Sequence, residues 1–166
     1  MWIVDFTVYR KFREHTDDRI SRTWNQESGV FSWGLGSVRV PRGFEHKAEP
    51  GIDTFVGSFT SQVDGLEIRY DIGELAGEHG GMNGSESLIR GARVRSVRAS
   101  SFAIVSFPDT GCATFSLETS DPRQALIIDG IGQSFQPADW KPAWLRPLLP
   151  EILRSDCRQR FRMPFE

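Results

Sequence analysis

The sequence predicts an α+β domain in which a helix packs on one face of an antiparallel β-sheet of about five to seven strands. Three observations favour this fold class. Residues 54–73, TFVGSFTSQVDGLEIRYDIG, hold two alternating runs separated by an Asp-Gly pair, which is the pattern of a β-hairpin. Residues 102–107, FAIVSF, are nearly all apolar, as in a strand buried on both faces. Residues 120–122, SDP, form the clearest helix start, because Ser or Asp caps a helix and proline is tolerated at its first position.

The chain before the hairpin predicts fewer regular elements. Residues 2–9 alternate between two faces and indicate a strand, whereas residues 10–29 are polar and charged and indicate a loop or a short helix. Residues 30–40 are apolar but contain two glycines, which predict a strand with a bulge or a close backbone approach. The Pro-Arg-Gly step at 41–43 ends this strand, and we expect Phe44 to enter the core.

The second strand of the hairpin has two different faces. Its apolar side chains, which we expect to be buried, are Leu66, Ile68, Tyr70 and Ile72. Its polar side chains, which share the opposite face, are Glu67, Arg69 and Asp71. The chain then enters a glycine-rich stretch, 74–91, which predicts one long loop.

The remaining strands and the helix follow this loop. Residues 92–99 predict a strand with Arg93 and Arg95 on one face, and we expect that face to lie near Glu67 and Asp71. Residues 112–118 predict another strand. The helix covers about 121–133, and the side chains that we expect it to bury are Ala125, Leu126, Ile128 and Ile131. Residues 134–136 indicate a return to extended chain.

The predicted domain organisation separates residues 1–136 from the C-terminal end. Residues 1–136 form a single α+β domain that begins with the N-terminal strand and polar loop of 1–29. Residues 137–166 form a Trp/Pro-rich appendage with a short helix that starts near Pro150. The composition supports one domain of ordinary size, since the chain has 166 residues and a net charge of −2.

Charge, hydropathy and cysteine content exclude several classes of function. A net charge of −2 gives no overall attraction to nucleic acid, and no apolar run reaches the about 18 residues that a membrane span needs. If Met1 is the true start, we expect the cytoplasm; a trimmed form leaves the compartment open. The spacing of Cys112 and Cys157 suits neither zinc binding nor CxxC redox chemistry, and a disulfide between them stays open. The sequence contains no cofactor-binding motif, and we expect the protein to bind no cofactor.

The order of elements between Phe31 and Gln136 also resembles a known pattern. Its motifs are the step PRGF at 41–44, the stretch GIDTFVG at 51–57, a strand ending in YDIG at 70–73, a strand ending in Phe-Pro, and a helix that leads into a short strand. This resembles small uncharacterised bacterial proteins with a Mog1/PsbP-like layout, an antiparallel sheet with helices packed on it. The resemblance covers roughly two-thirds of the chain. It implies binding or assembly rather than catalysis, and it carries over no catalytic residue.

Two functional hypotheses follow for the chain. The sequence favours a non-catalytic protein-binding or assembly module whose partner is another protein or a second copy. The apolar C-terminal segment either covers its own domain or offers interface anchors with a basic rim to a partner. The residues concerned are Trp140, Trp144, Leu145, Leu148, Arg158 and Arg160. The alternative is a small enzyme or metal-binding protein that uses Asp71, Glu74 and His79, since carboxylates and an imidazole transfer protons or hold a divalent ion.

Overall fold

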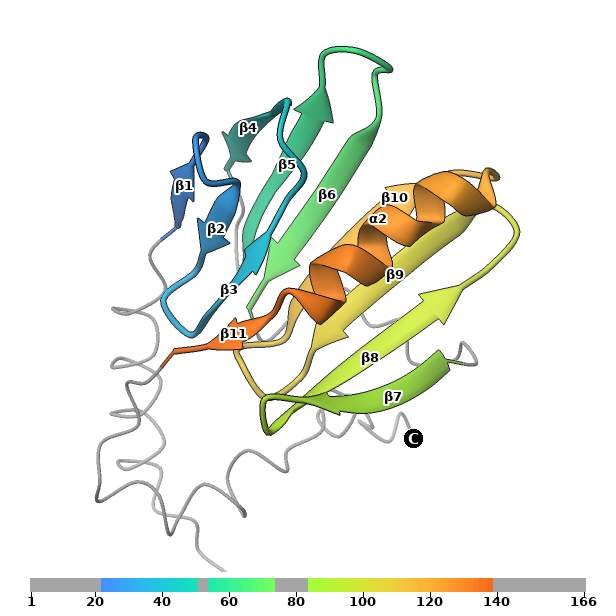
Figure 1. The fold of residues 1–166 in the computed structure, drawn as a ribbon. Coiled ribbons are helices and arrows are strands. Elements are labelled where there is room, and N and C mark those ends of the chain that lie inside the picture. The colour runs from blue at the N-terminus through green and yellow to red at the C-terminus, as the bar shows by residue number, and fades with distance from the viewer. Residues whose placement is uncertain (1–21, 51–53, 74–83, 139–166) are drawn as a thin grey trace, which may run out of the picture.

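The computed structural model describes residues 22–50, 54–73 and 84–138, and these residues form two packed layers (Figure 1). Within the described residues, one layer is a seven-stranded antiparallel sheet with the order β4-β5-β6-β10-β9-β8-β7. Its strands are β4 Phe44–Glu49, β5 Phe55–Ser61, β6 Glu67–Ile72, β7 Gly84–Ile89, β8 Ala92–Arg98, β9 Phe102–Phe107 and β10 Ala113–Glu118. The fold is therefore α+β and dominated by antiparallel sheet.

The second layer covers one face of this large sheet. It consists of helix α2 and a four-stranded sheet with the order β1-β2-β3-β11, as far as the described chain extends. Its elements are β1 Thr23–Asn25, β2 Val30–Ser32, β3 Gly36–Arg39, α2 Pro122–Gln133 and β11 Gln136–Pro137. The small sheet lies over the β4–β6 side and α2 over the β8–β10 side (Figure 1). No helix in the described ranges is both long and apolar enough to cross a membrane.

The large sheet is built from two meanders. Strands β4, β5 and β6 pair in chain order, and so do β7, β8, β9 and β10. The two meanders join where β6 pairs with β10, with Tyr70 opposite Phe115. Because every neighbouring pair is antiparallel, β7 runs parallel to β6 although three strands separate them. The predicted hairpin at 54–73 is confirmed, and Gly65 supplies the positive φ of 69° in its turn.

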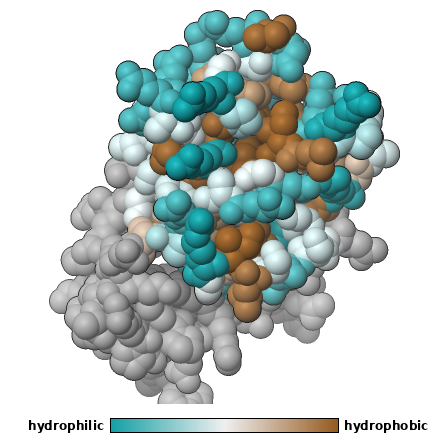
Figure 2. Space-filling model, in the orientation of Figure 1, coloured by the Kyte–Doolittle hydropathy of each residue, from teal (hydrophilic) through white to brown (hydrophobic). Residues whose placement is uncertain are grey.

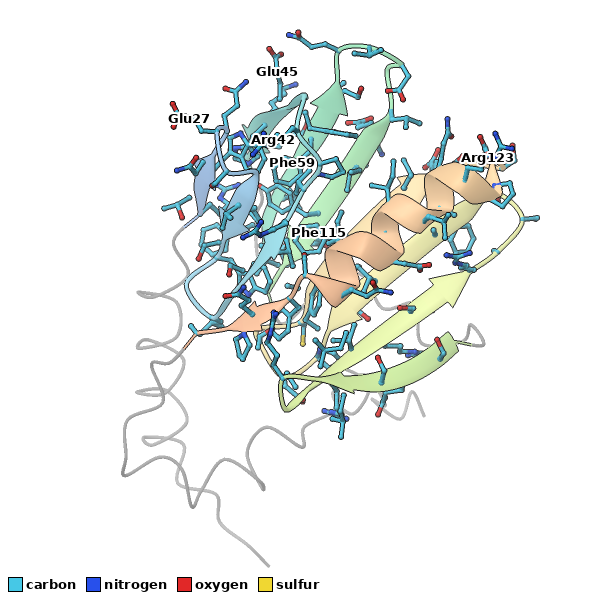
Figure 3. All side chains as sticks on the ribbon, in the orientation of Figure 1. Glu27, Arg42, Glu45, Phe59, Phe115 and Arg123 are labelled. Carbon is cyan, nitrogen blue, oxygen red and sulfur yellow. The ribbon has the colours of Figure 1, made fainter. Side chains whose placement is uncertain are left out.

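The core lies between the two layers and is rich in aromatic rings. Phe31 of β2 is at its centre, with ring centroids 4.7 Å from Tyr70, 5.1 Å from Phe59 and 6.1 Å from Phe115. Phe59 and Phe115 project from the inner face of the large sheet toward the covering layer (Figure 3). Ile68 and Tyr70 are buried as expected, whereas Glu67 and Arg69 are exposed on the opposite face. The expected entry of Phe44 into the core is also confirmed.

The stretch 30–40 is a hairpin rather than one strand, which corrects the sequence interpretation. The Trp33 N–H donates to the Gly36 carbonyl across 3.1 Å, and Gly34 has a φ of 84° in the turn between β2 and β3. Gly34 therefore allows the reversal of the chain. Gly36 also permits a close approach, because a Cβ there would lie 2.6 Å from the Phe135 ring.

Helix α2 begins as predicted, with Asp121 as its N-cap. The Asp121 carboxylate accepts a hydrogen bond of 2.8 Å from the Arg123 N–H. Ala125, Ile128 and Ile131 are buried, but the prediction for Leu126 is wrong because 57% of this residue is exposed. One residue after Ala125 is about 100° further around the helix, so Leu126 points away from the core.

Figure 2 shows hydrophobic side chains in small areas among hydrophilic ones on the face of the molecule that Figure 1 presents.

Three further expectations are corrected by the observed strands and by their order in the sheet. The predicted loop 74–91 contains β7, and the polar stretch 10–29 contains β1 in its described part. Strand β8 pairs with β7 and β9 and is separated from β6 by two strands, so its arginines do not meet Glu67 and Asp71. Instead Arg93 forms an ion pair of 2.8 Å with Asp109, and Arg95 lies opposite Glu86. The strand expected at 2–9 lies outside the described residues.

Candidate functional site

The residues proposed for acid/base or metal chemistry are only partly described. Asp71 lies on the outer face of β6, beside a groove of about 460 Å³ that Glu67, Arg69 and Thr114 also line. Glu74 and His79 lie outside the described residues. In the part of the chain that the structure describes, no group of three His, Cys, Asp or Glu side chains is arranged to hold a metal ion. The convergence that this hypothesis requires therefore remains a prediction.

The residues proposed for protein binding in the C-terminal segment also lie outside the described ranges. These are Trp140, Trp144, Leu145, Leu148, Arg158 and Arg160. The described chain does continue past the expected boundary at 136. Pro137 belongs to β11, and the Ala138 N–H donates to the Leu35 carbonyl across 3.1 Å. The small sheet thus includes Pro137, the first residue of that segment.

Strand β7 forms an open edge of the large sheet. Five of its six residues are exposed, and no described strand pairs with its outer side. The turn to β8 has two residues, Arg90 and Gly91, with φ values of 50° and 80°. In such a turn the flanking residues, Ile89 and Ala92, exchange both backbone hydrogen bonds, and every second pair beyond them does the same.

This alternation determines which backbone groups of β7 face away from β8. They belong to Gly84, Glu86 and Leu88, the residues between the hydrogen-bonded positions. The neighbouring strand confirms the phase, because the Arg93 N–H points away from β7 and donates to Asp109 across 2.9 Å. Leu88 is 74% exposed on the outer face of the same edge.

A groove runs beside this edge on the inner face of the sheet, where α2 packs on β8, β9 and β10 and leaves β7 uncovered. We call it the serine groove, since Ser85, Ser87 and Ser96 line its floor. Its volume is about 610 Å³. An ion pair between Arg98 of β8 and Asp129 of α2 lines the same groove. Leu126 precedes Asp129 by three residues and lies on the same side of the helix.

A third group of side chains lies at the opposite end of the large sheet. Nε2 of His46 on β4 is 3.0 Å from the hydroxyl oxygen of Tyr70 on β6. Arg22, just before β1, donates through Nη1 to the same hydroxyl across 3.3 Å and to the Val56 carbonyl across 2.8 Å. The hydroxyl has room because Gly57 lacks a side chain, and a Cβ at this position would collide with it.

Burial moves the pKa values of both titratable groups of this cluster in the direction that favours their neutral forms. Burial, and secondarily the Arg22 cation, lower the pKa of His46 below its ordinary value of 6.5. Burial raises the pKa of Tyr70 above 10.0, and the hydrogen bond from Arg22 opposes this only in part. In the neutral tautomer that carries its proton on Nδ1, Nε2 of His46 accepts a hydrogen bond and the Tyr70 hydroxyl has a proton to donate. In that tautomer the hydrogen bonds run from Arg22 to Tyr70 and from Tyr70 to His46.

The sequence interpretation missed this cluster because its members come from three distant segments. A signal was present in β4, where Phe44, His46 and Ala48 alternate with Glu45 and Lys47. That alternation places His46 on the core face.

The chain has no match among known family models, curated proteins or solved structures. Its functional assignment therefore rests on the geometry of its own residues. Of the three regions, the β7 edge with the serine groove has the form of a docking site, because an exposed backbone ladder lies beside a groove.

Proposed function

We propose that the protein is a non-catalytic protein-binding module that pairs the open edge of β7 with an extended segment of another polypeptide. The observation that carries this proposal is the row of outward backbone groups at Gly84, Glu86 and Leu88. Alternating N–H and C=O groups along an exposed strand are complementary to another extended backbone. The added strand would lie about 4.8 Å from β7 and extend the sheet.

Side chains on both faces of β7 would give the added strand its specificity. On the outer face, exposed Leu88 offers an apolar contact to the partner. On the inner face, alternate side chains of the partner would enter the serine groove between β7 and α2. Backbone hydrogen bonds then supply affinity, and the groove selects the side chains.

The two edges of the large sheet differ in a way that favours β7. Strand β4 carries Glu45, Lys47 and Glu49 on its outer face, and charged side chains are a common protection against edge pairing. Strand β7 carries one charged residue, Glu86. The large sheet therefore has one edge that resists pairing and one edge that permits it.

Two expectations from the sequence support the same class of function. The Mog1/PsbP-like resemblance implies protein binding or assembly, and a helix on one face of an antiparallel sheet agrees with that layout. We keep this relationship, and a second contact through Trp140 and Trp144, as parts of the proposal. An assembly role would use β7 for one partner segment and the C-terminal anchors for another.

A proline at an outward position of β7 tests the proposal. Glu86→Pro removes an outward N–H while the bonds between β7 and β8 remain, because Glu86 does not donate to β8. We expect it to weaken capture of partners from extracts of the native host by about tenfold or more, which corresponds to about 1.4 kcal/mol. Glu86→Ala is the matched control, since it removes the side chain but keeps the N–H.

The thermal unfolding of both variants is measured beside the binding assay. Loss of capture by Glu86→Pro but not by Glu86→Ala, with both proteins folded, supports strand addition. Equal capture by the wild-type protein and both folded variants contradicts it.

A further inference from the structure

The small sheet is held to the large sheet at its β1 edge by two neighbouring side chains. Arg22 bonds the Val56 carbonyl and the Tyr70 hydroxyl, and its guanidinium lies 5.1 Å from the Phe55 ring centroid. Trp24 packs edge-on against Phe59 with ring centroids 5.0 Å apart. Within the small sheet, β1 is an edge strand whose described partner is β2. Release of Arg22 and Trp24 would therefore free β1 from the large sheet.

We propose that Arg22, Tyr70 and His46 form an acid-sensitive latch that holds β1 against the large sheet while His46 is neutral and releases it when His46 is protonated. This inference concerns the β4 end of the sheet and does not depend on the proposed strand addition at β7.

Protonation of His46 would disrupt the hydrogen bonds that hold Arg22. With its proton on Nδ1, neutral His46 accepts a hydrogen bond from the Tyr70 hydroxyl, and the hydroxyl oxygen accepts one from Arg22, so one hydroxyl serves both neighbours. Protonated His46 has donors at both ring nitrogens and can no longer accept. Two cations would then compete for one oxygen, with their nitrogens separated by no more than two hydrogen-bond lengths. Like charges at this distance in a partly buried site repel each other.

The aromatic residues packed around His46 carry no negative charge that would pair with an imidazolium. The rings of Phe59, Phe31 and Trp24 lie 5.0, 5.5 and 6.3 Å from the imidazole centroid, and none of them is charged. Among the described residues that contact His46 or Tyr70, Arg22 is the charged group. Glu49, at the end of β4, contributes a small rise to the pKa of Tyr70, and its carboxylate is paired with Lys47 at 3.8 Å.

The direction of the pH effect follows from the lowered pKa of His46. A group that is neutral in the folded state and has a depressed pKa contributes its full stability above its unfolded value of about 6.5. That contribution is lost as the pH falls from about 6.5 through the lower folded value. The latch should therefore be closed at neutral pH and open under acid conditions.

Ring contacts seen by nuclear magnetic resonance in the full chain test the latch. We expect the Trp24–Phe59 cross-relaxation signal to be present at about pH 8 and lost at about pH 5, since these values bracket the ordinary histidine pKa of about 6.5. The Phe107–Phe135 signal, from rings 4.5 Å apart in the α2 half, should persist at both values. This second pair is the internal control for global unfolding.

Two variants test whether the loss of the Trp24–Phe59 contact at low pH comes from protonated His46 and from Arg22. His46→Gln keeps an acceptor but takes up no proton, so its Trp24–Phe59 contact should persist at low pH. Arg22→Gln removes the competing cation and should raise the pKa of His46, which is measured from the imidazole resonances. This measurement tests the latch even if His46→Gln does not fold. A wild-type Trp24–Phe59 signal that survives at low pH overturns the latch. So does parallel loss of the Phe107–Phe135 signal, or an unchanged His46 pKa in Arg22→Gln.

Discussion

The two ends of the large sheet are covered to different extents. At the β4 end, the small sheet reaches the outermost strand, because Trp24 and Phe31 both lie against His46. At the β7 end, α2 packs on β8 to β10 and leaves the serine groove beside the edge. The closed end carries aromatic rings and a buried hydrogen-bonded cluster, whereas the open end carries serines and an exposed backbone.

How far the second layer extends over each edge of the large sheet determines which groups are accessible there. Where the second layer extends over the last strand, side chains from distant segments become partly buried together, and their pKa values shift. Where the second layer stops short, a backbone edge stays accessible for a partner. Under the two proposals, one sheet would carry an acid-sensitive latch at one end and a protein-binding edge at the other.

The largest expected effect tests how far the closed end depends on aromatic packing. Phe31→Ala should lower the free energy of unfolding by about 3–5 kcal/mol, because it empties the centre of a fully buried ring cluster. Chemical denaturation measures this loss. A loss below about 1 kcal/mol would contradict the central role of Phe31.

A second pair of substitutions tests the cover at the other end. Ile128→Ala should cost about 2–5 kcal/mol, because Ile128 is buried beneath α2. Leu126→Ala on the same helix should stay within about 0.5 kcal/mol, because Leu126 is mostly exposed. Similar losses for both variants in urea unfolding would show that the assigned faces of α2 are wrong.

Asp109, in the turn between β9 and β10, connects this turn to the start of β8. Its carboxylate accepts hydrogen bonds from the Arg93 N–H and guanidinium at 2.8–2.9 Å, and both side chains are less than a third exposed. Asp109→Ala should cost about 1.5–3 kcal/mol, the range for hydrogen bonds to charged groups. Asp109→Asn keeps part of the geometry and should lose less. A thermal unfolding curve unchanged by Asp109→Ala would contradict this role.

Two glycines of α2 provide a matched test of packing against the large sheet. Gly130→Ala should stabilise the protein by about 0.5–1 kcal/mol, because a Cβ there meets nothing within 4 Å and alanine favours the helix. Gly132→Ala should not share this gain, because its Cβ would lie 2.9 Å from Val105 Cγ2. Calorimetric melting of the two variants separates these cases, and an equal gain would mean that α2 does not press on β9.

The smallest effect is expected on the outer face. Glu67→Ala should change the free energy of unfolding by about 0–1 kcal/mol, since its ion pair with Arg69 is exposed. Ile68→Ala, one residue further, should cost about 2–5 kcal/mol because Ile68 is fully buried. Equal costs in denaturant titrations would require a different register for β6.

The elements that the sequence predicted correctly have strong local patterns. The β5–β6 hairpin shows strict alternation around an Asp-Gly turn, and α2 has a clear cap. Strand β7 was missed because both of its faces are exposed, so its residues show no apolar alternation. Strand β4 was missed because His46 and Ala48 weaken its apolar face.

The candidate sites were harder to predict than the strands. Arg22, His46 and Tyr70 meet only after β4, β5 and β6 pair and the small sheet docks on them. No local pattern encodes such a meeting. The position of β7 at an edge depends on the order of the strands in the large sheet, which a single sequence does not show. The same order separates β8 from β6, so Arg93 of β8 pairs with Asp109, a partner that the sequence did not suggest.

The division of the large sheet into two meanders also has a consequence for how the chain folds. Each meander forms from neighbouring hairpins, and hairpins form in about 1–10 μs. The seam between β6 and β10 joins residues far apart in the sequence, so its closure entropy should set the folding rate. Substitution of Phe115 at this seam should therefore slow refolding, whereas changes in the β7–β8 hairpin should mainly accelerate unfolding.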